Sequence, residues 1–152
     1  MSFSINTLTQ EVCKIPALLD DSQNINKFLN RNKEKRVVVV QGLGFVGAVM
    51  SLVCANAITE DYAVIGVDLA NENTYWKIKS LNDGVFPLIA DDPKIVQFFN
   101  RTKEKGNFLA TYDSYAYEFA DVIIVDINLD VHKQANIDAS LKDFDLDLTD
   151  FK

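Results

Sequence analysis

The stretch that decides the fold is Arg36-Val37-Val38-Val39-Val40-Gln41-Gly42-Leu43-Gly44-Phe45-Val46-Gly47. Its valine run has no polar alternation, which is typical of a strand buried on both faces of a parallel sheet. Its last six residues match the pattern G-x-G-x-x-G. An apolar run from Ala48 to about Ile58 comes next and predicts a helix. A strand, a glycine loop and a helix in this order indicate a binding site for a dinucleotide.

Each glycine of this loop has a separate task. Gly42 permits the tight turn, Gly44 lets a pyrophosphate approach the backbone, and Gly47 lets the helix pack close to the sheet. The free N–H groups at the start of the helix add a partial positive charge. We therefore predict that the cofactor contacts six residues: Gly42, Leu43, Gly44, Phe45, Val46 and Gly47.

A second apolar run, Tyr62 to Val67, ends in an acid, Asp68. Its distance from the glycines is near the spacing of about 20 residues expected for the acid that binds an adenosine ribose. A carboxylate accepts hydrogen bonds from ribose hydroxyls and repels a 2′-phosphate, and no basic residue occurs between it and Lys77. Asp68 therefore favours NAD over NADP.

Two other interpretations of these residues stay open. The first is a cluster of turn glycines with an unrelated acid at the end of a strand. The second is a methyltransferase that binds S-adenosylmethionine on a similar sheet. The glycine loop of those enzymes usually reads G-x-G-x-G, whereas Val46 stands at the place of its last glycine.

The rest of the chain continues the alternation of strands and helices. We expect strands at 108–111 and 121–127, the second one buried, a helix at 93–100, and one or two helical turns at 114–120. This order predicts an α/β fold, a doubly wound and mostly parallel sheet of Rossmann type.

The first 35 residues differ in composition from the rest of the chain, because they are polar and rich in Asn. A helix is expected from Asp20, Asp21 or Ser22 to about Asn30. We expect 1–35 to be an N-terminal arm, partly helical, that packs on the main domain or on another subunit. Residues 36–152 would form the nucleotide-binding domain, with an acidic, solvated loop at 138–152.

Composition excludes several classes of function. The chain has 152 residues, 48% of them hydrophobic, and a formal net charge of −7. This charge argues against binding to nucleic acid or to an anionic membrane. Cys13 and Cys54 have no metal-ligand spacing and suggest no disulfide framework. No apolar run is long enough to span a membrane, and no signal peptide is recognisable. We expect a cytoplasmic protein without a metal site.

Three later segments carry a family resemblance. They are Leu81-Asn82-Asp83-Gly84 with Pro87, Ala110-Thr111-Tyr112-Asp113, and Ala120-Asp121-Val122-Ile123-Ile124-Val125. Together with the glycine loop and Val67-Asp68, they resemble the N-terminal NAD-binding domain of the UDP-glucose/GDP-mannose (nucleotide-sugar) dehydrogenase family. The resemblance runs from about Arg36 to Ile127.

The resemblance implies NAD as cofactor, a nucleotide sugar as substrate and a place for Thr111 beside the cofactor. In the family, the sugar C6 alcohol is oxidised to a carboxylate by hydride transfer to NAD, which serves polysaccharide biosynthesis, and we expect the full-length enzyme to be a homo-oligomer. The family's catalytic cysteine lies in later domains, and no residue of this chain matches it. We therefore expect a truncated, inactive piece of a longer enzyme, with no catalytic residue of its own.

One departure from the family pattern supports an alternative. Asn128-Leu129-Asp130 stands where the family has a Thr-Pro pair, so Leu129 supplies no hydroxyl. The alternative is a non-catalytic NAD-binding sensor or a degenerate homologue. A second departure concerns affinity: Asn73 stands where the family often has a basic residue, so we expect NAD to bind weakly.

Overall fold

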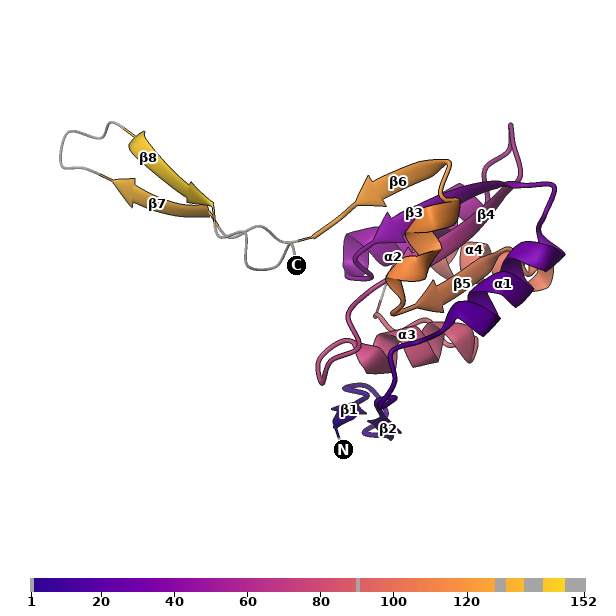
Figure 1. Cartoon of the computed structure of the whole chain (residues 1–152), viewed down its shortest axis with the longest axis horizontal. Helices are drawn as coiled ribbons and strands as arrows, with labels where there is room; N and C mark the ends of the chain where they lie inside the picture. Colours follow the sequence, from indigo (N-terminus) through magenta and orange to yellow (C-terminus); the bar gives the residue numbers. More distant parts are fainter. Residues whose placement is uncertain (1, 90, 128–130, 136–140, 147–152) are drawn as a thin grey trace.

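A computed structural model describes residues 2–89, 91–127, 131–135 and 141–146 (Figure 1). Its centre is a parallel sheet with the strand order β5-β4-β3-β6. The strands are β3 (Arg36–Gln41), β4 (Tyr62–Val67), β5 (Phe108–Thr111) and β6 (Val122–Val125). Val39 of β3 lies between Ile65 of β4 and Ile123 of β6. The predicted Rossmann-type α/β fold is confirmed.

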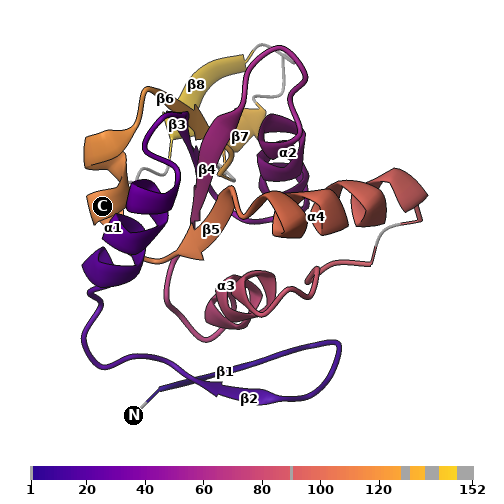
Figure 2. The same ribbon diagram turned by 90° about the vertical axis from the view of Figure 1, so that its right-hand side faces the viewer.

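Helices cover both faces of the sheet (Figure 2). One face carries α2 (Phe45–Ala55), α3 (Tyr75–Asn82) and α4 (Pro93–Lys105), and the other carries α1 (Ser22–Arg31) and the short 3₁₀ helix η1 (Ser114–Phe119). Val38 and Val40 pack against α2, whereas Val37 and Val39 pack on the side of α1. Because successive strand side chains point to opposite faces, burial on both faces explains the uninterrupted valine run.

The helix after the glycine loop begins earlier than expected. It starts at Phe45, with Gly44 as its N-cap, so the second half of the G-x-G-x-x-G pattern forms the first helical turn. Helix α4 starts at Pro93, as expected, and runs further than predicted, to Lys105. It ends where Gly106 adopts the left-handed conformation with φ +61°.

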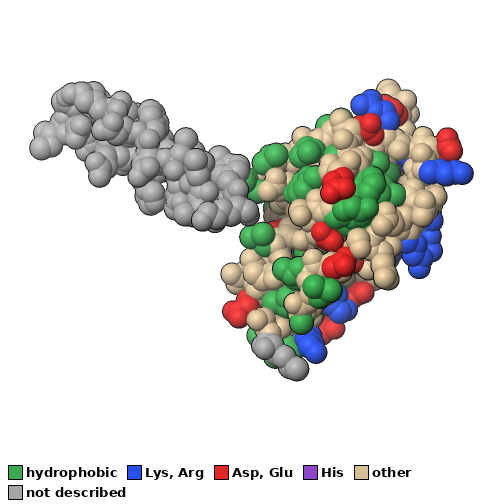
Figure 3. All heavy atoms as spheres, viewed as in Figure 1, with side chains coloured by type: hydrophobic (Ala, Val, Ile, Leu, Met, Phe, Trp, Pro, Cys, Tyr) green, Lys and Arg blue, Asp and Glu red, His purple; other side chains and the backbone are tan. Residues whose placement is uncertain are grey.

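Strand β6 departs from the prediction of a buried strand. Val122, Ile123 and Val125 are 40%, 49% and 56% exposed. The physical reason is position: β6 is an edge strand, and within the described residues it pairs with β3 alone. Hydrophobic side chains accordingly reach the surface on this side of the molecule (Figure 3).

The opposite edge of the sheet is bound by a side chain. Asn82, the last residue of α3, donates from Nδ2 to the carbonyl of Ala110 (2.7 Å) and accepts from the Ala110 N–H at Oδ1 (2.9 Å). Its amide therefore pairs with β5 as a neighbouring peptide group would. The Leu81–Gly84 segment thus fixes α3 to the sheet.

The N-terminal arm contains more regular structure than expected. Besides the expected helix, α1, it forms an antiparallel hairpin of β1 (Phe3–Ile5) and β2 (Val12–Lys14). The buried Ser4 hydroxyl donates to the carbonyl of Glu72 (2.7 Å) and accepts from the N–H of Trp76 (3.1 Å). The hairpin is thereby attached to the start of α3.

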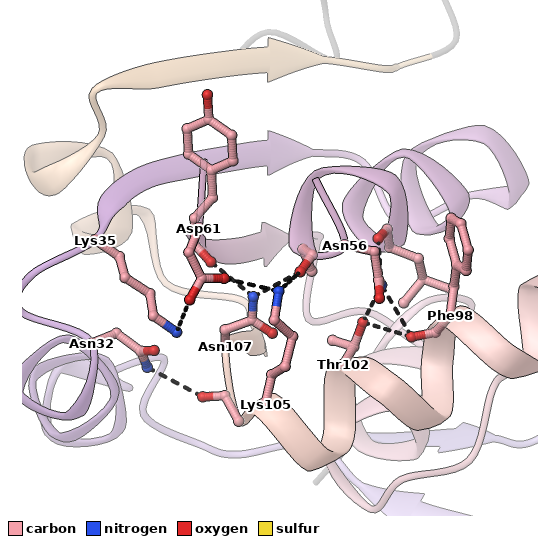
Figure 4. Close-up of polar contacts among 12 residues, drawn as sticks. Asn32, Lys35, Asn56, Asp61, Phe98, Thr102, Lys105 and Asn107 are labelled. Atoms are coloured by element: carbon pink, nitrogen blue, oxygen red, sulfur yellow. Dashed lines mark hydrogen bonds and ion pairs between the residues drawn. The ribbon is translucent and has the colours of Figure 1, made fainter. Parts of the chain in front are cut away.

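A polar network lies where the strands begin (Figure 4). The Asp61 carboxylate forms ion pairs with Lys105 (2.8 Å) and Lys35 (3.1 Å). Asn107 donates to the carbonyls of Ala55 and Tyr62, both at 2.9 Å. This network joins the ends of α2 and α4 to the segment after α1. It lies at the amino ends of the strands, opposite the glycine loop.

The C-terminal part contains a second antiparallel hairpin, formed by β7 (Val131–Ala135) and β8 (Leu141–Leu146). The expectation of a loop at 138–152 was therefore wrong where β8 forms. Residues 128–130, on which the missing Thr-Pro pair falls, lie outside the described residues. Among the helices that the structure describes, none has the length and apolar character needed to cross a membrane.

Candidate nucleotide-binding site

Two glycines of the loop occupy positions that no larger residue fits. Gly42 comes directly after β3 with φ +93°, and a Cβ there would lie 2.0 Å from the carbonyl oxygen of Asp126. A Cβ on Gly47 would lie 1.9 Å from the carbonyl oxygen of Gly42. The tasks expected of these two glycines, a tight turn and a close approach of helix to strand, agree with this geometry.

Gly44 faces open space. No atom lies within 4 Å of a Cβ built on it. The first bond of α2 runs from the Ala48 N–H to the Gly44 carbonyl (3.0 Å), so the amides from Gly44 to Gly47 have no acceptor within the helix. Phe45 and Val46 are more than half exposed. Space, free N–H groups and the partial positive charge of a helix start therefore coincide, and they fit a pyrophosphate.

Asp68 lies against this loop from the end of β4. Its Oδ2 accepts a hydrogen bond from the Leu43 N–H (2.9 Å), and its Oδ1 accepts one from the Leu69 N–H (2.7 Å). The side chain is half-buried. A carboxylate has about four acceptor positions, so these two bonds orient Asp68 and leave capacity for ribose hydroxyls. The structure brings the predicted acid and the predicted loop together.

Thr111 lies at the end of β5, next to Asp68. Its carbonyl accepts the Asp68 N–H (3.1 Å). Its hydroxyl is fully buried, donates to Asp21 Oδ2 (2.6 Å) and accepts from the Asp113 N–H (3.2 Å). The hydroxyl of Thr111 therefore has partners within the chain, one of them from the N-terminal arm.

Sequence reasoning missed two acids at this edge. Asp21 has a local explanation as a helix cap, and no local signal connects it with Thr111. Asp126 comes directly after β6, and its Oδ2 lies 3.1 Å from the position of a Cβ on Gly47, at the first turn of α2. The place of Asp126 at a strand end next to β3 was the available signal. Its carboxylate puts a negative charge beside the amides proposed for phosphate.

Two tyrosines near these acids have raised pKa values. Burial raises the pKa of Tyr117, and the charge of Asp68 raises it further. Burial also raises the pKa of Tyr112, with Asp21 as the next contributor. The carboxyl end of the sheet, where Asp68 and Asp21 both lie, therefore carries negative charge. In the part of the chain that the structure describes, no group of three or more His, Cys, Asp or Glu residues is placed to hold a metal ion.

Comparisons with known proteins show where else this fold occurs. Two solved structures share the fold: NDP-N-acetyl-D-galactosaminuronic acid dehydrogenase from Methanosarcina mazei Go1, with 22% identity and a TM-score of 0.61, and UDP-D-ManNAc dehydrogenase from Pyrococcus horikoshii, with 23% identity and a TM-score of 0.53. The matches cover 84% and 76% of this chain, but only 25% and 23% of those proteins. The chain thus spans about a quarter of their length. No curated protein matches the sequence.

The family assignment comes from a family model. The model of the NAD binding domain of the UDP-glucose/GDP-mannose dehydrogenase family matches residues 35–144, which include the glycine loop and Asp68. The match covers more than half of the chain and makes NAD its cofactor. The chain belongs to the UDP-glucose/GDP-mannose dehydrogenase family, of which it contains the NAD-binding domain.

Proposed function

We propose that NAD lies across the carboxyl ends of β3 and β4. The free amides of Gly44, Phe45, Val46 and Gly47 hold the pyrophosphate, and Asp68 accepts hydrogen bonds from the adenosine ribose. Gly42 and Leu43 shape the loop, since their N–H groups are bonded to the Val67 carbonyl and to Asp68. Thr111 belongs to the site through its carbonyl, which holds the Asp68 N–H. The observation that carries this proposal is the bond of 2.9 Å between the Leu43 N–H and the Asp68 carboxylate, which puts the ribose acid beside the phosphate loop.

We further propose that this domain, residues 36–152 with the arm 1–35, serves a nucleotide-sugar 6-dehydrogenase. When bound, NAD supplies the hydride acceptor for oxidation of the sugar C6 alcohol. The residues of this chain bind and orient the dinucleotide, and no residue of it is assigned a catalytic role. The family membership supports this proposal, which extends to an oligomeric enzyme of cytoplasmic polysaccharide biosynthesis.

One sequence feature favours a second candidate, a non-catalytic NAD-binding sensor. Leu129 provides no hydroxyl at the place of the family threonine. Reading the gene beyond the codon of Lys152 separates the two candidates. A downstream segment with a catalytic cysteine supports the dehydrogenase, and its absence supports the sensor.

Titration calorimetry of the purified chain with NAD and NADP tests the binding proposal. We expect weak binding of NAD, because Asn73 replaces a common basic contact, and still weaker binding of NADP, because Asp68 faces the added phosphate. Equal affinities for the two dinucleotides, or no heat with NAD at millimolar concentration, contradict the proposed roles of the loop and of Asp68.

A further inference from the structure

The N-terminal arm reaches the carboxyl edge of the sheet at Asp21. The contact is reciprocal: Asp21 Oδ2 accepts from the Thr111 hydroxyl (2.6 Å), and the Asp21 N–H donates to Asp113 Oδ2 (2.8 Å). Thr111 is fully buried and Asp21 is 9% exposed. Because water has little access to these groups, the hydroxyl has no easy substitute for its acceptor. Figure 2 shows α1, which begins directly after Asp21, beside β5.

A path of hydrogen bonds continues from this contact to the glycine loop. The Thr111 carbonyl accepts the Asp68 N–H (3.1 Å), and Asp68 Oδ2 accepts the Leu43 N–H (2.9 Å). The backbone of Asp68 is therefore held by the residue that Asp21 holds. A shift of the Thr111 carbonyl would therefore move the backbone that carries the Asp68 carboxylate.

The arm is attached elsewhere by bonds that do not enter this path. Ser4 binds at the start of α3. Asn32, at the end of α1, donates to the carbonyls of Phe28 (3.1 Å) and Gly106 (3.2 Å), where the strands begin. Asn32 is 5% exposed and uses its side chain as fully as Asp21 does. The arm is therefore anchored at both ends of the sheet, and of these three described contacts the one at Asp21 alone leads to the proposed nucleotide site.

We infer that Asp21 is a positioning residue for NAD: through Thr111 it holds the Asp68 carboxylate in the orientation that meets the adenosine ribose. The inference rests on the proposed roles of the glycine loop and Asp68. It makes the arm part of the cofactor site, although the family match begins only at residue 35. Affinity for the ribose hydroxyls then depends on a residue outside the family domain.

The first test compares Asp21→Ala with the matched control Asn32→Ala. Both remove a buried polar side chain of the arm, so both lower the melting temperature. We expect Asp21→Ala to weaken NAD binding about 3- to 10-fold and to leave binding of the analogue with a 2′-deoxyadenosine moiety almost unchanged. Asn32→Ala keeps the wild-type ratio of the two affinities. If the ratio of the affinities for NAD and its 2′-deoxy analogue changes equally in both variants, or changes in neither, the inference is wrong.

The second test uses Thr111 and holds even where Asp21→Ala does not fold. Thr111→Ser retains the hydroxyl and is expected to keep the preference for NAD over its 2′-deoxy analogue. Thr111→Val removes the hydroxyl and is expected to reduce this preference. The same preference in both variants counts against the path. If the wild-type chain binds no NAD, the proposed function fails first. Normal binding with insensitive Asp21 and Thr111 variants defeats this inference alone.

Discussion

The backbone N–H of Leu43 and the carboxylate of Asp68 are joined by a hydrogen bond of 2.9 Å, which ties the glycine loop after β3 to the end of β4. The Leu43 side chain strengthens the junction. It is fully buried, and its Cδ2 lies 2.6 Å from where a Cβ on Gly66 would be. The backbone of Leu43 thus faces the acid while its side chain packs against β4, so loop and acid keep a fixed relation.

Substitutions at two glycines of the loop are expected to separate an effect on NAD binding from an effect on stability. Gly44→Val is expected to remove NAD binding because the side chain occupies the space of the pyrophosphate. It costs little stability, because an added Cβ meets no atom within 4 Å and φ is −64°. Gly47→Ala is the contrasting variant, since its Cβ would lie 1.9 Å from the Gly42 carbonyl oxygen and lower the melting temperature. Calorimetry and thermal denaturation measure both effects. Undiminished NAD binding by Gly44→Val contradicts the loop assignment.

Asp68 is expected to set the preference for NAD over NADP. Hydrogen bonds to a charged group contribute on the order of 1.5–3 kcal/mol each, so Asp68→Ala is expected to weaken NAD binding by about tenfold or more and to narrow the gap to NADP. The variant also loses the bond to the Leu43 N–H, so a melting curve accompanies the two affinities. A fixed ratio of affinities together with lower stability means that Asp68 only braces the loop.

Asp126 is expected to weaken phosphate binding by its charge. Its carboxylate lies at the first turn of α2, where free amides face the proposed pyrophosphate. Asp126→Asn removes the charge at similar volume and is expected to strengthen NAD binding by about 3- to 10-fold at low salt, with a smaller gain at high salt because of screening. Glu104→Gln, an exposed change at the end of α4, controls for net charge. If both variants gain NAD affinity equally, the effect comes from net charge and not from the position of Asp126.

Asp61 makes part of the stability dependent on pH. Hydrogen bonds from Lys105 and Lys35 hold the pKa of its carboxyl below the usual range. The stabilisation is therefore present above the pKa of the unfolded chain and is lost as the pH falls through the lower pKa of the folded chain. The side chain is 49% exposed, so the effect is at most about 1 kcal/mol. Urea denaturation should show Asp61→Asn less stable than wild type at neutral pH and equal to it at about pH 2.

The chain by itself is expected to be inactive. We expect no residue in it to act as the family nucleophile, and it spans about a quarter of the dehydrogenases that share its fold. The measurement is NADH absorbance after incubation of the purified chain with NAD and UDP-glucose, UDP-N-acetylmannosamine or GDP-mannose. Sustained formation of NADH with any of these sugars refutes the expectation.

The central strands and the glycine loop were predictable because their signals are local. A run of four valines needs cover on both faces, and the glycines match positions where a Cβ meets the backbone. The exposure of β6 was not predictable in this way. Its sequence is as apolar as that of β3, and only the strand order reveals that one of its edges has no described neighbour.

The contact of the arm with the site was also beyond sequence reasoning. Asp21 and Thr111 are 90 positions apart, and the acid pair Asp20-Asp21 before a helix has a sufficient local explanation as a cap. The place of Thr111 beside the cofactor was inferred from the family resemblance. The hydrogen-bond partner of its hydroxyl depends on how α1 packs across the sheet. Long-range pairing of this kind leaves no periodic trace in the sequence.

The amide of Asn82 has a consequence for assembly. An exposed edge strand is a template for pairing with another chain, and proteins that aggregate through strands use such edges. Because Asn82 already occupies both backbone groups of Ala110, an incoming strand would have to displace α3 before it could extend the sheet at β5. Among the described residues, β6 has no neighbour on its outer side, so we expect a further strand, from this chain or from another, to extend the sheet there more readily than at β5.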